Sequence, residues 1–420
     1  MKVLVIGSGG REHALVWILK SSPRVSAIFA APGNGGTAAL AQNLDIEPTD
    51  FPRLLEAVLS NNIDLVVVGP EGPLAAGIAD EFKSRMIPVF GPSRVAAQLE
   101  SSKSFARDLM EKYAIPCARG KSFTDYAAAK AYLAEQNLPV VVKADGLAAG
   151  KGVSVCSSWT EAETALANMM ENKIFGEAGS KVIIEECLTG QEMSYLAFTD
   201  GKTFSAMPPA CDYKRVFDGN QGPNTGGMGA YSPPPFFDRQ MSALIDATIM
   251  GPMVCALASE GIDYRGVIYA GLMLTSEGPK VLEFNARFGD PETQVILPQL
   301  KSDLVDVIQA VVDGNLDKVS IEWQKKSCVT VVLASGGYPG DYKKGLPIRG
   351  LEYVDADVNL FHAGTKLVDG QLVTSGGRVM AVTACGNNFA DARGQVYYNA
   401  IKIKFDGAHY RSDIALFKSQ

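Results

Sequence analysis

The first hundred residues alternate short apolar runs with longer amphipathic stretches. Each run is rich in β-branched residues and too short for a helix, which is typical of a buried strand. Helical spacing follows the first run at residues 11–20 and returns at 51–60. Strands and helices that alternate in this way build a parallel sheet covered on both faces, so we predict an open parallel α/β sheet here. The apolar runs lie at residues 2–7, 25–30, 63–68 and 87–91.

A helical pattern at residues 102–113 places Phe105 and Leu109 on one apolar face, with Ser102 as a possible N-cap. Lys103 lies in the first turn, where a positive charge opposes the helix dipole. The pattern therefore predicts either an exposed solubilising lysine or a functional one, and the sequence alone leaves both open.

Residues 140–154, VVKADGLAAGKGVSV, nearly match a nucleotide-binding P-loop. A P-loop needs glycine, four residues, Gly-Lys and then Ser or Thr, and it leads into a helix. Here Asp145 replaces the first glycine, Gly152 replaces the hydroxyl residue, and the segment joins two β-rich runs. A Gly/Ala loop between strands lets backbone N–H groups approach a triphosphate, and Lys143 and Lys151 add positive charge. We expect a phosphate-binding lid.

Residues 281–293, VLEFNARFGDPET, carry the densest chemistry in the chain. On a strand, Glu283, Asn285 and Arg287 point to one face. A carboxylate and an amide oxygen are hard ligands suited to Mg²⁺, and an arginine can hold a carboxylate or phosphoryl group. A merely solvent-facing strand is less favoured, because asparagine is depleted in strands. Asp290, followed by proline, predicts a helix N-cap.

The glycine turn GSGGREH after the first strand suggests a dinucleotide site but does not complete the motif. The third glycine of Gly-x-Gly-x-x-Gly is replaced by Glu12, and no acid follows the second strand, which disfavours NAD. A close turn before a helix still favours an anion. Because loops 31–34 and 69–74 also follow strands, we expect a phosphate-sugar site at this sheet edge, although turn residues alone would look similar.

Composition limits the classes of partner. The chain has 420 residues, 47% hydrophobic and 20% charged, which is ordinary for a globular protein of roughly three domains. A net charge of -7 without a basic run argues against nucleic acid or an anionic membrane, so small molecules are the expected partners. Neither a signal peptide nor an apolar span is evident, so we expect a cytoplasmic protein, monomeric or weakly homo-oligomeric.

The cysteines and histidines offer little chemistry. Seven cysteines, far apart and never in Cys-x-x-Cys, predict core thiols, a reducing compartment and no zinc site. The three histidines form no Ser-His-Asp or Cys-His pattern, and His362 is expected to be structural because a lone histidine lacks a partner to orient it.

Two lysines, a glycine-rich loop between strands, an acidic hinge and a Glu-x-Asn-x-Arg strand, in this order, resemble the ATP-grasp superfamily. Within it, segments along the whole chain resemble the phosphoribosylamine-glycine ligase family: GSGGREHAL, APGNGGT, VVGPEGPL, KADGLAAGKGV, GPNTGGMGAYSP, GGYPGDY and EFNARFGDPETQ. The resemblance implies ATP-dependent ligation of glycine to 5-phosphoribosylamine through glycyl phosphate, in purine biosynthesis.

The resemblance also implies a multidomain α/β and α+β fold. The open parallel sheet would occupy residues 1–100, and an ATP-grasp core would occupy 101–325 with a small lid subdomain at about 121–189. Residues 326–420 would form a mixed α+β domain, with strand-like runs such as GLEYVDA and one helix near 388–401.

Residue roles carry over by position. Glu185, Glu186 and Leu188 would contact adenine, with Glu192 at the ribose. Glu283 and Asn285 would bind Mg²⁺, with Mn²⁺ possible, and the strand at 267–275 supplies no further acid. Arg287 and Asp212 would be catalytic: Arg287 would hold the reacting carboxylate or phosphoryl group, and Asp212 would hold the ammonium of glycine.

The other residues expected at ATP are Lys103, Lys143, Asp145, Gly146, Gly150, Lys151 and Gly152. Those expected at the substrates are Gly9, Gly10, Asn34, Glu71, Lys214, Thr225, Gly226 and Gly227. The glycines of residues 212–233 would form an anion nest.

Three alternatives remain open at this stage. Another ATP-grasp carboxylate-amine ligase would share the nucleotide site but not the use of glycine. A nicotinamide oxidoreductase would use the first domain. A non-catalytic nucleotide-binding regulator would bind ATP without turnover and would not need Glu283, Asn285 and Arg287 together.

Overall fold

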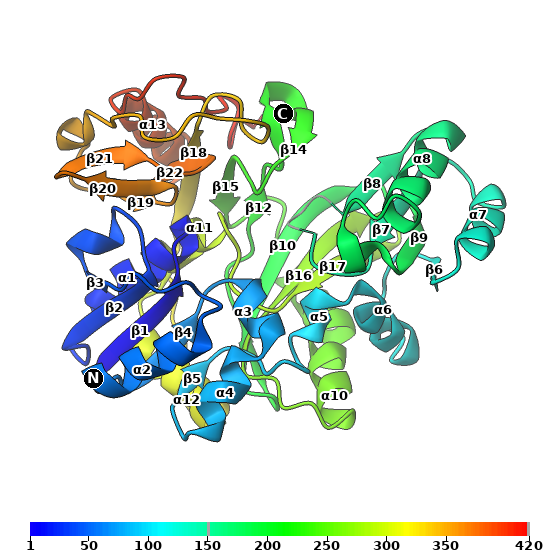
Figure 1. Cartoon of the computed structure of the whole chain (residues 1–420), viewed down its shortest axis with the longest axis horizontal. Helices are drawn as coiled ribbons and strands as arrows, with labels where there is room; N and C mark the ends of the chain where they lie inside the picture. The colour runs from blue at the N-terminus through cyan, green and yellow to red at the C-terminus, as the bar shows by residue number, and fades with distance from the viewer. Residues whose placement is uncertain (149–151, 418–420) are drawn as a thin grey trace.

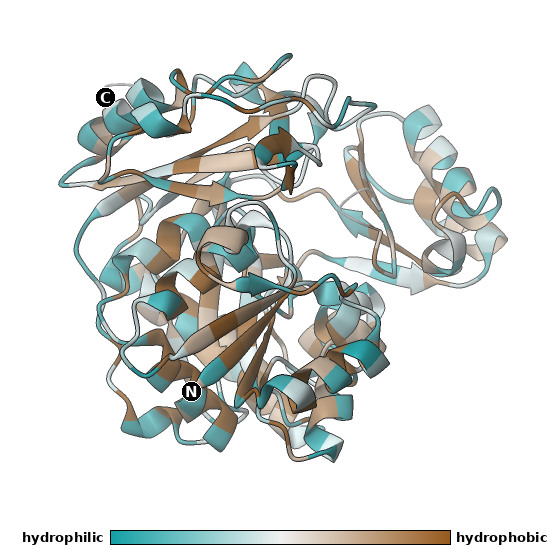
Figure 2. Cartoon of the chain, turned by 60° about the vertical axis from the view of Figure 1, so that its left-hand side comes forward, coloured by the Kyte–Doolittle hydropathy of each residue, from teal (hydrophilic) through white to brown (hydrophobic). Residues whose placement is uncertain are grey.

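The computed structural model describes residues 1–148 and 152–417, and its N-terminal part forms one parallel sheet in the order β3-β2-β1-β4-β5 (Figure 1). Val3 and Val5 pack on one side with α1, and Leu4 and Ile6 pack on the other with α2 and α4. The predicted open parallel sheet is confirmed, and its strands are mainly brown, hydrophobic, in Figure 2. The elements are β1 Lys2–Gly7, α1 Gly10–Lys20, β2 Ala27–Pro32, β3 Gln42–Asn43, α2 Phe51–Asn61, β4 Leu65–Val68, α3 Glu71–Ala76, α4 Ile78–Ser84 and β5 Val89–Phe90.

Strand β1 lies between β2 and β4, so the loops that follow these three strands share one edge of the sheet. The carboxylate of Glu12 fills the space between two of them. Its Oε2 accepts from the N–H of Gly9 at 2.6 Å, a Cβ on Gly69 would overlap its Oε1, and a Cβ on Gly7 would lie 2.6 Å from its Cδ. A buried acid therefore stands where a dinucleotide pyrophosphate would need room, in agreement with the argument against NAD.

A small antiparallel sheet, β6-β9-β7-β8, forms a separate lobe with α7 and α8 (Figure 1). Its own core includes Val140, Val142 and Leu166. The loop between β7 and β8 connects antiparallel strands, as predicted, and Gly150 and Lys151 of the expected lid lie outside the described residues. The elements are β6 Gly120–Phe123, α7 Tyr126–Ala134, β7 Val140–Ala144, β8 Val153–Cys156, α8 Trp159–Met170 and β9 Val182–Glu186.

A second antiparallel sheet, β11-β10-β16-β17, carries the polar strand singled out in the sequence. Its strands are β10 Gln191–Thr199, β11 Phe204–Ala206, β16 Gly266–Thr275 and β17 Gly278–Asn285. The short helix α5 (Gln98–Ser101) packs against β17 and leads into α6 (Lys103–Lys112). The predicted N-cap of α6 is confirmed, because Ser102 Oγ accepts from the N–H of Phe105 at 3.2 Å.

One helical stretch, Arg239–Ser259, is long and apolar enough by composition to cross a membrane. It consists of α9 (Arg239–Ile245), a π-helical segment and α10 (Gly251–Ser259). Ile249 and Met253 are fully buried and pack in the largest hydrophobic cluster of the protein. Packing inside the protein accounts for part of the apolar character of this stretch, since 39% of its most apolar 18 residues are buried.

The C-terminal part contributes three strands to a third antiparallel sheet, β12-β15-β18-β22-β19, with α13 packed against it. The first two strands come from residues 211–232, so this segment is more ordered than a loop. The strand expected at GLEYVDA is wrong, because Leu351–Tyr353 forms a 3-10 turn after Gly350, which has a positive φ of 89°. The elements are β12 Cys211–Asp212, β13 Arg215–Phe217, β14 Gln221–Asn224, β15 Gly229–Ser232, α12 Leu304–Asp313, β18 Ser327–Ala334, β19 Asn359–His362, β20 Thr365–Val368, β21 Gln371–Thr374, β22 Arg378–Gly386 and α13 Phe389–Ala400, with α11 Thr293–Ile296 preceding α12.

The expectation of seven core thiols is wrong in two respects. Cys328 and Cys385 form a disulfide, and Cys255 is exposed. The two bonded residues lie 57 positions apart, but the register of β18 and β22 places them directly opposite each other. Strand pairing, which the spacing of cysteines does not reveal, brings them together.

We predict that Gly69→Ala destabilises the N-terminal sheet by about 1–3 kcal/mol, because the new methyl group would overlap Glu12 in a packed interior. The measurement is urea unfolding followed by circular dichroism. Gly72→Ala is the matched control, since a Cβ at Gly72 meets no atom within 4 Å. Equal unfolding midpoints for both variants would contradict the proposed packing.

Candidate active site

The two lysines predicted to bind ATP approach β17 from different elements. Lys103 begins α6, and its Nζ donates to the carbonyl of Gly146 at 3.1 Å. Lys143 lies in β7, and its Nζ donates to the carbonyl of Leu282 at 2.9 Å. The pairing of β16 with β17 shifts at this point and skips Leu282, which leaves its carbonyl free to accept. A β-bulge thus joins the lid sheet to the polar strand.

Positive charge surrounds Glu283 on β17. Burial acts to raise the pKa of Glu283, but the charges of Lys214, Lys143 and Lys103 outweigh it and hold that pKa below its usual value. Burial in turn lowers the pKa of Lys103, and the charge of Glu283 opposes this shift. Of the two interpretations left open for Lys103, a freely solvated lysine is the less favoured, because its side chain is half-buried and interacts with the charge of Glu283.

Glu185, predicted at adenine, is committed to two ion pairs inside the protein. Its Oε2 lies 2.6 Å from Nζ of Lys143, and its Oε1 accepts from Nη1 of Arg107 at 2.9 Å. All three side chains are less than 10% exposed. The carboxylate therefore holds Lys143 in place, and its contact with adenine stays a prediction.

The remaining residues expected around the base and ribose lie near the surface. Glu186 pairs with Arg119 at 2.9 Å, and Leu188 is half-buried after β9. Glu192 pairs with Lys214 at 2.9 Å. This pair links a residue expected at the ribose to one expected at the acceptor substrate.

The described parts of the lid loop have clear structural partners. Asp145 Oδ1 accepts from the N–H of Ser104 at 2.6 Å, at the positive end of α6. A Cβ on Gly146 would lie 2.7 Å from Cβ of Ala178, and a Cβ on Gly152 would lie 2.7 Å from Cβ of Ala148. These contacts require glycine for packing at both ends of the loop, independently of any ligand.

Asp212 lies in a group of charged residues beside β10. Burial and the carboxylates of Glu292 and Glu192 raise its pKa to about 7, although Lys214 opposes them. Desolvation acts to lower the pKa of Lys214, whose side chain is 40% exposed, but the charges of Asp212 and Glu192 raise it. Asp212 therefore titrates near neutrality, and Lys214 stays charged.

The anion nest expected within residues 212–233 stays a prediction, and in this structure the backbone donors of residues 225–227 already have partners. The N–H of Thr225 donates to the carbonyl of Lys214 at 2.7 Å, and the N–H of Gly226 donates to the hydroxyl of Tyr338 at 3.0 Å. The N–H of Gly227 donates to Oγ1 of Thr225 at 3.0 Å. The donor of Gly226 is satisfied by the C-terminal part, and those of Thr225 and Gly227 are satisfied within residues 214–227.

Asp290 does not cap a helix, contrary to the sequence prediction. Helix α11 begins at Thr293, and its N-cap position is occupied by Glu292. Asp290 Oδ1 instead accepts from Nε2 of Gln294 at 2.8 Å and pairs with Arg378 at 3.2 Å. An arginine from β22, distant in sequence, attracts the carboxylate away from the helix end.

The first and second loops of the N-terminal sheet meet the C-terminal part at Asn34. Its Nδ2 donates to the carbonyls of Ser8 and His362, both at 2.8 Å, and its Oδ1 accepts from the N–H of Gly36 at 2.8 Å. Asn34 is therefore used to hold loops together. Gly9 and Gly10 lie at the start of α1, where a Cβ on Gly9 would be 3.0 Å from Oδ2 of Asp290.

His362 has the structural surroundings that were expected. Its backbone N–H donates to Nδ1 of His13 at 2.7 Å, and its ring lies 3.2 Å from the hydroxyl of Thr365. Burial lowers the pKa of His362 to about 4, and burial together with His362 lowers the pKa of His13 to about 3. Both rings are neutral at pH 7.

Arg287 lies just beyond β17 and forms ion pairs with two glutamates. Its Nε lies 3.3 Å from Glu71 at the start of α3, and its Nη2 lies 3.0 Å from Glu100 on α5. Its Nη2 also donates to Oδ1 of Asn285 at 3.2 Å. The predicted orientation of Asn285 and Arg287 toward a common face is confirmed.

Several charged residues around the site were missed by sequence analysis. Each is buried or half-buried and contacts a predicted site residue or its neighbour. Glu292 accepts from the hydroxyls of Tyr269 at 2.5 Å and Ser194 at 3.1 Å. Its place in GDPET, directly after the polar strand, was the available signal; the others follow no strand or loop motif. The missed residues are Arg11, Glu100, Arg107, Glu292 and Arg378.

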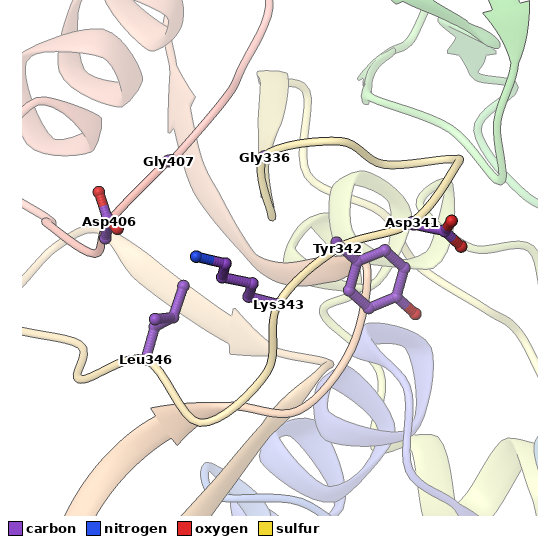
Figure 3. A pocket seen from close by; sticks show the side chains of 7 residues that line it. All are labelled: Gly336, Asp341, Tyr342, Lys343, Leu346, Asp406 and Gly407. Atoms are coloured by element: carbon purple, nitrogen blue, oxygen red, sulfur yellow. The ribbon is translucent and has the colours of Figure 1, made fainter.

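A cavity of about 490 Å³ opens in the C-terminal part, away from these residues (Figure 3). Figure 3 shows Lys343 extending toward the space between Leu346 and Gly407. Its lining mixes charges of both signs and includes none of the residues predicted for ATP, metal or substrates: Gly336, Asp341, Tyr342, Lys343, Leu346, Asp406 and Gly407.

Comparison with known proteins identifies similar chains over the full length. Three domain families match in order: the phosphoribosylglycinamide synthetase N domain at residues 1–100, its ATP-grasp (A) domain at 101–293 and its C domain at 328–416. A phosphoribosylamine–glycine ligase from Caldanaerobacter subterraneus is 51% identical over 415 residues, covering 99% of both chains.

Comparison with solved structures leads to the same family. The crystal structure of a phosphoribosylamine–glycine ligase from Thermotoga maritima is 34% identical, has a TM-score of 0.84, and covers 98% of this chain and 100% of that one. A biotin carboxylase from Campylobacter jejuni, in complex with an ATP analogue, shares the fold at 14% identity, with a TM-score of 0.75 and coverage of 97% and 92%. The chain belongs to the phosphoribosylglycinamide synthetase family of ATP-grasp ligases.

Proposed function

We propose that this chain catalyses the ATP-dependent ligation of glycine to 5-phosphoribosylamine in de novo purine biosynthesis. The products are glycinamide ribonucleotide, ADP and phosphate. The observation that carries the proposal is the charge arrangement around Glu283, with Lys103, Lys143 and Arg287 nearby, in a chain that matches the family over nearly its whole length. The substrates are small phosphorylated or zwitterionic metabolites, and the proposed location is the cytoplasm.

The proposed reaction has two steps and needs no enzyme nucleophile. A carboxylate oxygen of glycine attacks the γ-phosphorus of ATP, the bond to the ADP oxygen breaks, and glycyl phosphate forms. The amine of phosphoribosylamine then attacks the carbonyl carbon, phosphate leaves with the electron pair of its C–O bond, and the amine loses a proton. Catalysis by the protein then rests on alignment and on neutralisation of negative charge.

Lys103 and Lys143 are the proposed ligands of the ATP phosphates. Both ammonium groups are held by backbone carbonyls at the junction of α6, the lid sheet and β17. The loop from Asp145 to Gly152 is the proposed lid, and the glycines at its ends allow backbone N–H groups to approach phosphate oxygens. Adenine is proposed to lie beside Glu185, Glu186 and Leu188, with the ribose at Glu192.

The residues around β17 fit a magnesium ion that is held mainly by phosphates and water. The described residues include no group of three or more His, Cys, Asp or Glu side chains suited to a metal, so few protein ligands are available. The surrounding lysines favour the ionised form of Glu283, and Asn285, two residues further along β17, carries an amide oxygen that in this structure accepts from Arg287. Glu283 and Asn285 would hold Mg²⁺ or Mn²⁺, and the metal ion would neutralise phosphate charge.

The acceptor side of the site is proposed to lie between Arg287 and the loops of the N-terminal sheet. Arg287 would hold the reacting carboxylate of glycine, and ionised Asp212 would hold its ammonium. Lys214 would balance charge there. Phosphoribosylamine is proposed to contact Gly9, Gly10, Asn34 and Glu71 at the sheet edge and the Thr225–Gly227 segment, which would rearrange to free its N–H groups.

Release of ADP tests the function directly. With Mg-ATP, glycine and phosphoribosylamine generated from ribose 5-phosphate and ammonia, ADP should appear together with a product that contains labelled glycine. Omission of any single component should abolish that product.

Leaving out single components of the assay also distinguishes the alternative functions. ADP release that does not depend on glycine would overturn the substrate assignment and leave an ATP-grasp ligase of other specificity. A folded protein that binds ATP but never releases ADP would favour a regulator.

We predict that Glu283→Gln lowers kcat of ligation by about 10²–10³, because it removes a half-buried charge that orders the phosphates and the metal. The fold should persist, as judged by an unchanged circular dichroism spectrum. Glu163→Gln, which alters a half-exposed surface ion pair with Lys130, is the control and should leave kcat unchanged. Near-normal kcat for folded Glu283→Gln would remove Glu283 from the metal site.

Activity should also depend on the ionisation of Asp212. Because its pKa lies at about 7, kcat/KM for glycine should rise with pH up to about 7 as the carboxylate that binds the ammonium becomes charged. In Asp212→Asn this rise should disappear. Initial rates at low glycine between pH 5.5 and 8.5, at saturating ATP, measure both profiles. An identical pH profile for the two proteins would exclude Asp212 as the ammonium ligand.

Stability gives an independent check on the same group. The folded pKa of about 7 lies above the ordinary value of 3.8, so the native state binds the proton more tightly between these values. The resulting stabilisation is complete below about pH 4 and is lost as pH rises through about 7. Asp212→Asn should therefore gain stability relative to the wild type between pH 5 and pH 8 in urea unfolding.

A further inference from the structure

Arg287 has contacts of two different kinds in this structure. Its Nη2 is held from two sides, at 3.0 Å by Glu100 and at 3.2 Å by Asn285. Its Nε and Nη1 have longer contacts, each 3.3 Å, with Glu71 and with the carbonyl of Phe288. The closest contact is therefore made by Glu100, a residue 187 positions earlier in the chain.

Glu100 is itself anchored to the backbone beside Arg287. Its Oε2 accepts from the N–H of Ala286 at 2.8 Å, and its Oε1 faces the guanidinium. One carboxylate thus holds both the end of β17 and the side chain that follows it. Its side chain is only 8% exposed, so little water competes for these contacts.

The second carboxylate near Arg287, that of Glu71, has a longer contact with Arg287 and is more exposed than Glu100. Glu71 contacts Arg287 only through Nε at 3.3 Å, and its side chain is 36% exposed. Burial acts to raise the pKa of Glu71, but the charges of Arg287 and Arg11 together with hydrogen bonds hold that pKa below its usual value, whereas burial prevails and raises the pKa of Glu100 in spite of Arg287. Because the side chain of Glu71 is the more exposed of the two, it can exchange its contact for one with water, while the 8% exposed side chain of Glu100 has no such alternative.

We propose that Glu100 is a positioning residue for the ligation, which fixes the guanidinium of Arg287 through Nη2 and the N–H of Ala286 while Glu71 yields to the incoming carboxylate. The inference rests on the proposed function, because it assumes that Arg287 holds the carboxylate of glycine. Glu100 acts through Arg287 and does not contact the substrate. Since α5 leads directly into α6, the same segment also sets the start of the helix that carries Lys103.

A purely structural role for Glu100 makes different predictions. Loss of a packing contact would lower stability and affect every substrate alike. A positioning role affects the step that uses Arg287, so it changes the kinetic constants for glycine more than those for ATP. The effect also depends on Arg287 being present.

The test is Glu100→Gln, which keeps an acceptor for Ala286 but removes the charge that orients the guanidinium. We expect kcat/KM for glycine to fall about 10- to 100-fold, as when a catalytic group is slightly misplaced, with KM for ATP within about twofold. Glu277→Gln is the matched control, because Glu277 lies in the turn of the same β16–β17 hairpin and pairs with Lys280 at the surface. That variant should match the wild type.

A double-mutant cycle with Arg287→Lys decides the mechanism. In the Arg287→Lys background, Glu100→Gln should change kcat/KM for glycine by less than about threefold, because the group it positions is already altered. If the two effects multiply, Glu100 acts independently of Arg287 and the proposal is wrong.

Glu100→Asp covers the case in which Glu100→Gln fails to fold. It keeps the charge but shortens the side chain by one methylene, so a folded variant should still lose kcat/KM for glycine. Wild-type kcat/KM in either folded variant would overturn the proposal. Absence of glycine ligation by the wild-type chain would instead overturn the proposed function, so the two failures are distinguishable.

Discussion

The buried carboxylate of Glu185 is the interaction on which the arrangement of the site depends. It neutralises Arg107 on α6 and Lys143 on β7 at the same time, although it belongs to β9. Burial of any one of these charges alone would cost several kcal/mol, so the three are stable only together. Because α6 packs on β17 and the other two strands belong to the lid sheet, this ion group connects the lid sheet to the sheet that contains β17. The position of Lys143 follows from that connection.

The polar strand is fixed from its other side by the N-terminal sheet. Glu71, at the edge of that sheet, and Glu100, in the segment that follows it, both reach Arg287. Asp290, a few residues further on, pairs with Arg378 from the C-terminal part. Residues 285–290 are therefore held by charges from three regions of the chain. An arrangement of this kind suits a reaction that must align three substrates without a covalent enzyme intermediate.

The periodicity of single segments correctly predicted the features that depend on local interactions. The apolar runs became the buried strands of a parallel sheet, and the cap of α6 follows from Ser102. The alternation in β17 correctly oriented Asn285 and Arg287. The departures have a common origin in tertiary partners: Asp290 is drawn to Arg378 instead of capping a helix, and the N–H of Gly226 is satisfied by Tyr338, 112 positions further along the chain. No periodicity within a segment carries information about a partner that distant.

The same reasoning explains which site residues escaped notice. Chemical patterns select side chains that would meet a ligand, and for these the sequence was informative. The carboxylates that balance them, such as Glu100 and Glu292, have no pattern of their own, because their identity is set by the charge they must neutralise. Every buried cation needs a carboxylate of this kind as its partner. A ligand that brings negative charge must then compete with the carboxylates already present, and the order in which they yield is set by their anchoring. A carboxylate bonded to backbone, as Glu100 is to Ala286, remains in place, whereas an exposed one with a single long contact, as Glu71 has, is displaced first.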